Sequence, residues 1–69
     1  MERQNVNSTR IKSIGYDSLN ETLEVEFMKK FVYQYYWVNQ ETYNRLMDSQ
    51  SIGKYFDINI KKNYQSSRV

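Results

Sequence analysis

The sequence predicts an α+β fold, in which a three-stranded antiparallel meander is followed by two short helices that cover one face of the sheet. Apolar and polar residues alternate through 22–28 and 31–38, and this period of two is typical of half-buried strands. Residues 40–49 and 51–63 instead carry apolar residues three and four positions apart, which indicates amphipathic helices. A sheet with one apolar face needs a second layer, and we expect the helices to supply it.

The first strand is expected over about residues 9–16, after a flexible N-terminus of residues 1–8 that shows no periodicity. Ile11 and Ile14 have opposite parity in this strand, so both can face the core only if the strand contains a bulge. Gly15 is the expected position of the distortion, because glycine in a strand often marks one.

The second strand is expected over about residues 22–28, where side chains of opposite character alternate. Its apolar face holds Leu23, Val25 and Phe27, and its polar face holds Glu24 and Glu26. The two glutamates are about 7 Å apart on such a strand, which is within the range of catalytic carboxylate pairs. No other catalytic residue type joins them. A half-buried strand that shows glutamates to solvent explains the pair, and we expect no enzymatic activity.

The third strand is expected over about residues 31–38, and its sequence FVYQYYWV holds five aromatic rings in eight positions. Such rings either stack nucleic-acid bases or fill a core. By parity Tyr33 and Tyr35 share a face with Phe31 and Trp37, and this face continues the apolar face of the second strand. We therefore expect Tyr33 and Tyr35 in the core.

Two helices are expected after the strands. Asn39 is a suitable N-cap for a helix over about residues 40–49. The second helix, over about 51–63, has Ile52, Phe56 and Ile60 in an i, i+4 row, although a strand through residues 55–61 is the alternative. Residues 65–69 are expected to form a flexible tail.

Composition limits the chemistry that the chain can perform. A domain of 69 residues buries only about 60% of its unfolded surface, and the chain has neither Cys nor His to add a disulfide or a metal. Zinc sites of the usual kind, cysteine nucleophiles and His-dependent triads are thereby excluded. We expect no cofactor and no metal. No apolar run approaches the roughly 20 residues of a membrane span and residues 1–8 are polar, so we expect a cytoplasmic protein without a membrane partner.

The charges are unevenly distributed, although the formal net charge is only +2. Residues 49–69 hold four basic residues against one acid. Lys54, Lys61 and Lys62 lie on one side of the second expected helix. We therefore take the following basic residues as candidate phosphate contacts: Lys54, Lys61, Lys62, Arg68 in the tail, and Arg10 and Lys12 in the first strand. The alternative is an ordinary solvated helix face.

Several short motifs resemble, in their order and spacing, the KTSC domain, a small domain named for its place at the C-terminus of some lysyl-tRNA synthetases and also found as stand-alone bacterial proteins. The motifs are Ser8–Ile11, Ile14–Asp17, Leu23–Phe27, Tyr33–Tyr35, Ser51–Phe56 and Ile60–Tyr64. The resemblance implies a single KTSC-like domain over residues 9–64. The resemblance assigns no role to its motif residues, and we expect these six in the core: Tyr33, Tyr35, Gly15, Tyr16, Ser51 and Gly53.

Two functions remain open at this point. The synthetase context implied by the resemblance, together with the basic last helix, favours a non-catalytic module that binds RNA through that helix. The mild net charge and the acidic sheet face instead favour protein–protein interaction or oligomerisation. That second function would use an unpaired sheet edge, or Ile58 together with Tyr36 and Val32.

Overall fold

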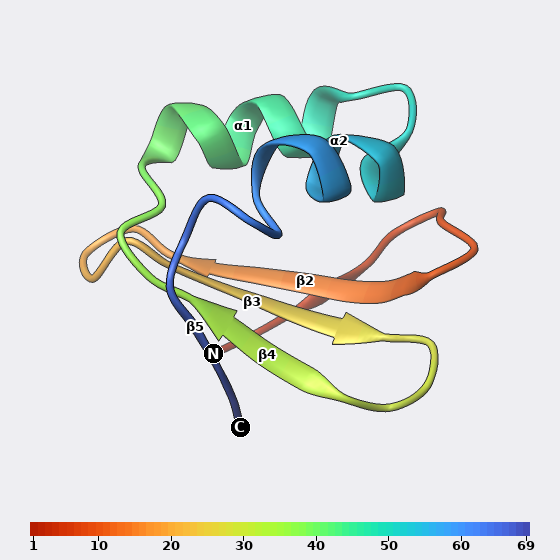
Figure 1. Cartoon of the computed structure of the whole chain (residues 1–69), viewed down its shortest axis with the longest axis horizontal. Helices are drawn as coiled ribbons and strands as arrows, with labels where there is room; N and C mark the ends of the chain where they lie inside the picture. The colour runs from red at the N-terminus through yellow and green to blue at the C-terminus, as the bar shows by residue number, and fades with distance from the viewer.

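A five-stranded antiparallel sheet lies beneath two helices in the computed structural model, which describes all residues 1–69 (Figure 1). The elements in chain order are β1 (Gln4–Asn5), β2 (Ile11–Asp17), β3 (Thr22–Phe27), β4 (Val32–Tyr35), α1 (Gln40–Asp48), α2 (Ile52–Asn59) and β5 (Ser66–Arg68). Neighbours in the sheet follow the order of the chain. The α+β class, the antiparallel sheet and the two covering helices are as predicted.

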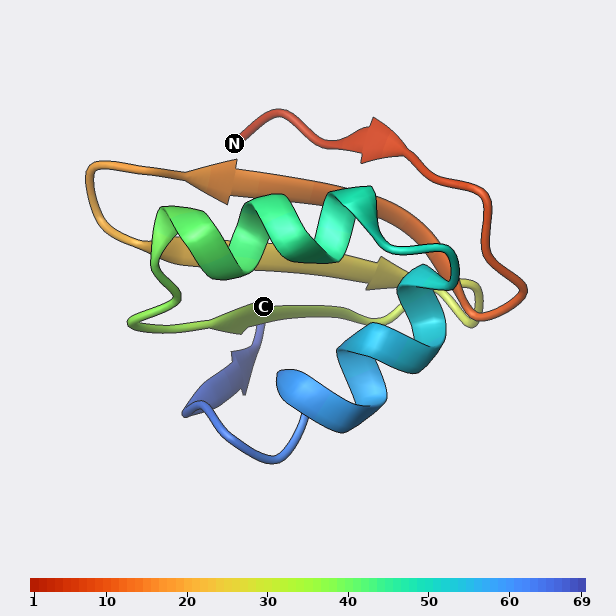
Figure 2. The same cartoon turned by 90° about the horizontal axis from the view of Figure 1, so that it is seen from above.

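The sheet has five strands and not the predicted three, because the two terminal segments add one strand each. Gln4 in β1 lies opposite Ile14, and Ser66 in β5 lies opposite Tyr35. Figure 2 shows the two short strands at opposite edges of the sheet. Residues 1–8 and 65–69 were expected to be flexible, and the sequence did not reveal these strands. Strands of two and three residues are too short to show an alternation of apolar and polar residues, and their partners are distant in sequence.

The predicted bulge in the first strand exists, but it lies at Lys12 and not at Gly15. The register shifts between Ile11 and Ser13, and this shift turns both Ile11 and Ile14 into the core. Gly15 has a different role. A Cβ atom there would lie 2.5 Å from the carbonyl oxygen of Glu2, so glycine lets the N-terminal segment cross β2 closely.

The face of β4 that meets the helices is the one the sequence predicted. Val25 lies opposite Tyr33 and Leu23 opposite Tyr35, so these four side chains share a face. Trp37 was expected on the same face, and that prediction is wrong. The strand ends at Tyr35, and Trp37 has a φ of 65° and is 74% exposed, because the left-handed backbone turns its ring away from the sheet.

The first helix begins at its expected cap, Asn39, whereas Ser51, expected as the first residue of the second helix, is its N-cap. The Asn39 side chain accepts a hydrogen bond from the Thr42 amide at 2.9 Å, and the Ser51 side chain accepts one from the Lys54 amide. The second helix ends at Asn59, four residues short of the prediction, and the alternative strand through this segment is absent.

The core lies between the two layers. Its nine buried hydrophobic residues are Ile11, Ile14, Leu23, Val25, Tyr35, Val38, Leu46, Phe56 and Ile60. Neither helix is long and apolar enough to cross a membrane.

Candidate functional site

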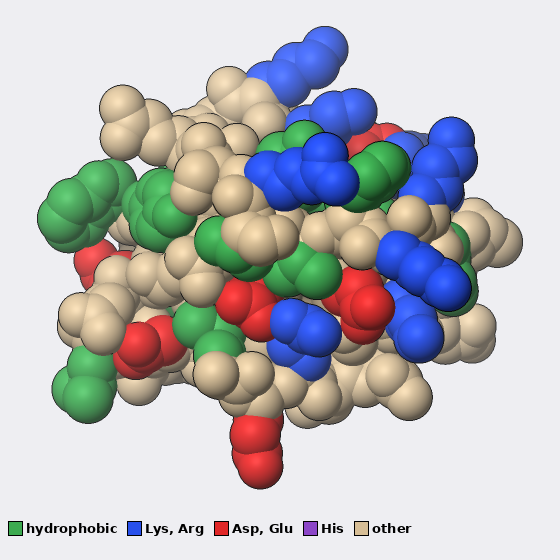
Figure 3. Space-filling model, turned by 90° about the horizontal axis from the view of Figure 1, so that it is seen from below, with side chains coloured by type: hydrophobic (Ala, Val, Ile, Leu, Met, Phe, Trp, Pro, Cys, Tyr) green, Lys and Arg blue, Asp and Glu red, His purple; other side chains and the backbone are tan.

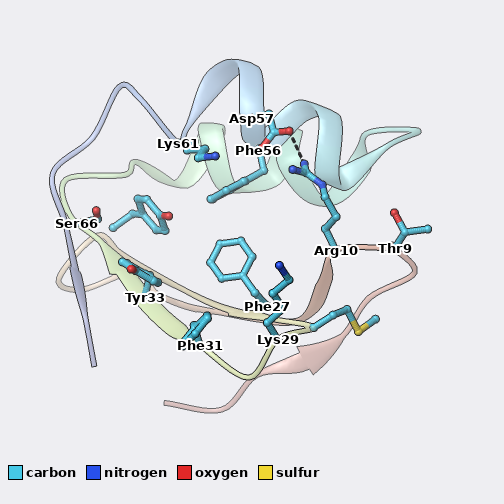
Figure 4. Close-up of a pocket in the computed structure, with 12 residues that line it drawn as sticks. Thr9, Arg10, Phe27, Lys29, Phe31, Tyr33, Phe56, Asp57, Lys61 and Ser66 are labelled. Carbon is cyan, nitrogen blue, oxygen red and sulfur yellow. Dashed lines mark ion pairs between the residues drawn. The ribbon is translucent and has the colours of Figure 1, made fainter.

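A pocket of about 500 Å³ opens between the sheet and α2, beside the turn that joins β3 to β4 (Figure 4). Five aromatic rings line it, and they come from three elements and one turn: Phe27, Phe31, Tyr33, Tyr35 and Phe56. The rings come from both layers, the sheet side and α2, and they leave part of the space between them open.

The rings at the base of the pocket hold one another in edge-to-face contacts. Phe56 meets Phe27 at 5.6 Å and Tyr35 at 5.2 Å between ring centroids, with interplanar angles of 66° and 83°. Phe27 meets Tyr33 at 6.0 Å. Such contacts add to the stability that burial alone gives. Phe31, at 41% exposed, forms the part of the wall that faces solvent.

Charged side chains surround the rings. Arg10, Lys29 and Lys61 line the pocket, against the single carboxylate of Asp57. The lining is therefore net positive. An apolar cavity with a cationic rim favours a ligand that combines a flat apolar ring with negative charge.

Arg10 is fixed by two contacts to α2. Its Nη2 atom donates a hydrogen bond to the Gly53 carbonyl at 2.8 Å and also pairs with the Asp57 carboxylate. Both contacts use the same nitrogen, which leaves the other guanidinium N–H groups for a ligand. A Cβ atom at Gly53 would lie 3.3 Å from this nitrogen, so the glycine permits the close approach.

Tyr35 has the most perturbed ionisation in the pocket. Burial first, and then the neighbouring Tyr33 and Asp57, raise the pKa of Tyr35 to about 12. Its hydroxyl therefore stays protonated at physiological pH and can donate a hydrogen bond. The Asp57 Oδ1 atom is buried without a hydrogen-bond partner, which adds an unsatisfied acceptor to the same region.

The structure brings together only some of the predicted phosphate contacts. Arg10 and Lys61 line the pocket, and the Arg68 guanidinium lies 4.3 Å from the centroid of the Phe31 ring. Lys54 lines a neighbouring hollow. Lys12 and Lys62 are exposed and line neither space. Viewed from the sheet side, Lys and Arg side chains gather toward the upper right of the molecule (Figure 3).

Sequence reasoning missed Lys29, Phe27 and Phe31 as site residues. The pair Lys29-Lys30 directly precedes the aromatic run of residues 31–38, and this combination is the signal that could have pointed to them. Among the residues expected to form an interaction surface, Tyr36 donates a hydrogen bond to Gln34 on the sheet face that also holds Val32, so only Ile58 is separated from the others. Val32 lies on the sheet face away from the helices, whereas Ile58 is exposed on α2.

Two of the family motif residues, Tyr33 and Tyr35, line the pocket, and the prediction that all six lie in the core is wrong for Ser51, which is exposed. Tyr16 donates a hydrogen bond to the Val38 carbonyl, and Ser51 caps α2. Tyr35 is in the core as predicted, and Tyr33 is half-buried in the pocket wall.

Comparison with known proteins identifies the family. The model of the KTSC domain matches residues 7–64. The chain belongs to the KTSC domain family. It is also similar to an uncharacterized protein of Stutzerimonas stutzeri, with 35% identity over 57 residues that cover 83% of this chain and 80% of that one.

A solved structure extends the similarity to the whole fold. The crystal structure of a KTSC domain protein from Yersinia pestis matches this chain with a TM-score of 0.96 and 38% identity. The match covers 99% of this chain and 96% of that one. It therefore includes the two edge strands at the termini of this KTSC domain.

Proposed function

We propose that this KTSC domain is a non-catalytic module that binds single-stranded RNA in the cytoplasm, with one base in the aromatic pocket. The observation that carries the proposal is the combination of five rings with three cationic side chains around one cavity. Proteins that bind single strands combine stacking rings with a basic path for the backbone, and each stacked base contributes about 1–3 kcal/mol.

The proposal assigns RNA binding to only part of the basic C-terminal segment. Lysines on a helix face alone are an ordinary surface feature. Lys61 and Lys62 lie in the turn after α2 and not on the helix as predicted. Of the two, only Lys61 lies at the rim of the aromatic cavity, opposite Lys29 and Phe31 on the sheet side. Phosphates at the rim would be held there by Lys29, Lys61 and Arg10 while the base occupies the interior.

Two neighbouring lysines provide a matched test. We expect Lys61→Glu to weaken binding of a labelled, mixed-sequence single-stranded RNA about tenfold in fluorescence anisotropy, which corresponds to about 1.4 kcal/mol. Lys62→Glu makes the same change of net charge at an exposed position outside the pocket, and we expect an effect of about twofold or less. Affinity should also fall steeply with salt, because phosphate contacts release counterions.

A pair of aromatic variants tests the ring contribution. Phe31→Ala should weaken binding at least about fivefold, whereas Trp37→Ala removes an exposed ring outside the pocket and should have little effect. Equal losses from Lys61→Glu and Lys62→Glu would contradict a defined site. Absence of binding together with a concentration-dependent mass would favour the alternative function, a protein-interaction or self-association module that uses a sheet edge.

A further inference from the structure

A second hollow, of about 450 Å³, adjoins the aromatic pocket on the side of the segment that precedes β2. It lies between residues 7–10 and the first turn of α2, and only one of its ten lining residues is hydrophobic. Ser8, Ser51 and Lys54 are among its lining residues. This lining differs from that of the aromatic pocket and suits a sugar and a phosphate rather than a ring.

The two spaces share part of their walls. Thr9, Arg10 and Asp57 line both. Arg10 is therefore placed between an aromatic interior and a polar hollow, and its contacts to Gly53 and Asp57 fix its guanidinium there. An arginine held in this way is preorganised to bind a phosphate, because little side-chain freedom remains to be lost on binding.

We propose that the pocket and the hollow form one continuous site for two consecutive nucleotides. One base occupies the aromatic pocket, the phosphodiester group that follows or precedes it binds Arg10, and the sugar and phosphate of the neighbouring nucleotide occupy the hollow beside Lys54. This inference rests on the proposed function, and it adds that the smallest ligand to fill the site is a dinucleotide.

A site for two nucleotides and a site for one nucleotide predict different affinities for short ligands. A mononucleotide makes only the contacts of the aromatic pocket and its rim. A dinucleotide adds the Lys54 side of the hollow at little further entropic cost, because the second unit is already tethered to the first. Lys54 should therefore matter only for ligands longer than one nucleotide.

The test compares three probes by NMR titration of the ¹⁵N-labelled full chain. The probes are an equimolar mixture of the four 5′-mononucleotides, the randomised 5′-phosphorylated dinucleotide, and a mixed-sequence RNA octamer. We expect the dinucleotide to bind at least tenfold more tightly than the mononucleotides. The mononucleotides should shift the amides of Phe31 and Tyr33, and the dinucleotide should also shift those of Ser51 and Lys54.

Two variants complete the test. Lys54→Ala should weaken dinucleotide binding threefold or more and leave mononucleotide binding unchanged within twofold, while Lys62→Ala should leave both unchanged. Equal affinity for the mononucleotides and the dinucleotide, with octamer binding intact, would overturn the two-nucleotide site and leave the proposed function standing. Failure of the octamer itself to bind would overturn the proposed function.

Discussion

Glu24 and Glu26 both pair with Arg3, and these contacts tie the N-terminal segment to the outer face of the sheet. Glu24 is the more buried of the two carboxylates, although it was expected to face solvent. The residue is 7% exposed, pairs with Arg3, and accepts a hydrogen bond from Gln34 Nε2 at 2.9 Å. Burial raises the pKa of Glu24, but the hydrogen bonds from Gln34 and Arg3 and the charge of Arg3 outweigh it, so the pKa lies below its ordinary value. The charged form is therefore the stabilising one.

The sign of this shift predicts an acid dependence of stability. A depressed pKa in the folded state contributes stability above the pKa of the unfolded chain, and this contribution is lost as the pH falls through the folded value. We expect the free energy of unfolding, measured by urea denaturation, to decline below about pH 4. Arg3→Ala should remove part of this dependence and lower stability at pH 7 by roughly 1–3 kcal/mol.

The matched control for Arg3→Ala is Arg45→Ala. Arg45 forms an exposed i, i+4 ion pair with Glu41, and such pairs contribute about 0.3–0.5 kcal/mol. Equal losses of stability from the two variants at pH 7 would show that the Arg3–Glu24 pair is no more important than a surface pair.

At the scale of elements, the sequence predicted the helices and strands that have a clear local pattern of residues. The strand over 22–28 alternates cleanly and Asn39 is a strong cap, so β3 and the start of α1 were predicted correctly. The start of α2 was predicted to within one residue, at 51 instead of Ile52. The edge strands β1 and β5 depend on pairing with partners distant in sequence. They are only two and three residues long, so alternation of side chains cannot reveal them. The prediction for Trp37 was wrong for a related reason. A positive φ at this bulky residue ends the alternation of the strand, and no glycine in the sequence indicates the change.

The docking of β1 depends on the missing side chain of Gly15. We expect Gly15→Ala to destabilise the domain by about 1–3 kcal/mol in urea denaturation, because its Cβ atom would meet the backbone oxygen of Glu2 at 2.5 Å and displace the N-terminal segment.

Gly53→Ala provides the comparison for this variant. Its Cβ atom would meet only side-chain atoms, of Ser8 at 3.2 Å and Arg10 at 3.3 Å, and alanine gains helix propensity of up to about 1 kcal/mol. The net effect should be smaller than that of Gly15→Ala. A larger loss at Gly53 would contradict the close approach of residues 1–3 to Gly15.

At the scale of the whole molecule, the site arises from the way the two layers meet. Arg10 and Lys61 were predicted from charge alone, although they are 51 positions apart in the chain. The cavity between them was not predictable, since it depends on how far α2 stands from the sheet and on which rings fill the gap. Parity predicted Phe27 and Phe31 only on the apolar face of the sheet, and the three-dimensional arrangement places them beside an open space.

The measurement that tests the RNA-binding pocket most directly is a ¹H–¹⁵N NMR titration of the chain with mixed-sequence single-stranded RNA at low and near-physiological salt. The account predicts shifts centred on Phe31, Tyr33 and Lys61 that weaken as the salt concentration rises. Shifts confined to residues remote from the pocket, such as Leu19 and Trp37, or no shifts at low salt, would contradict it.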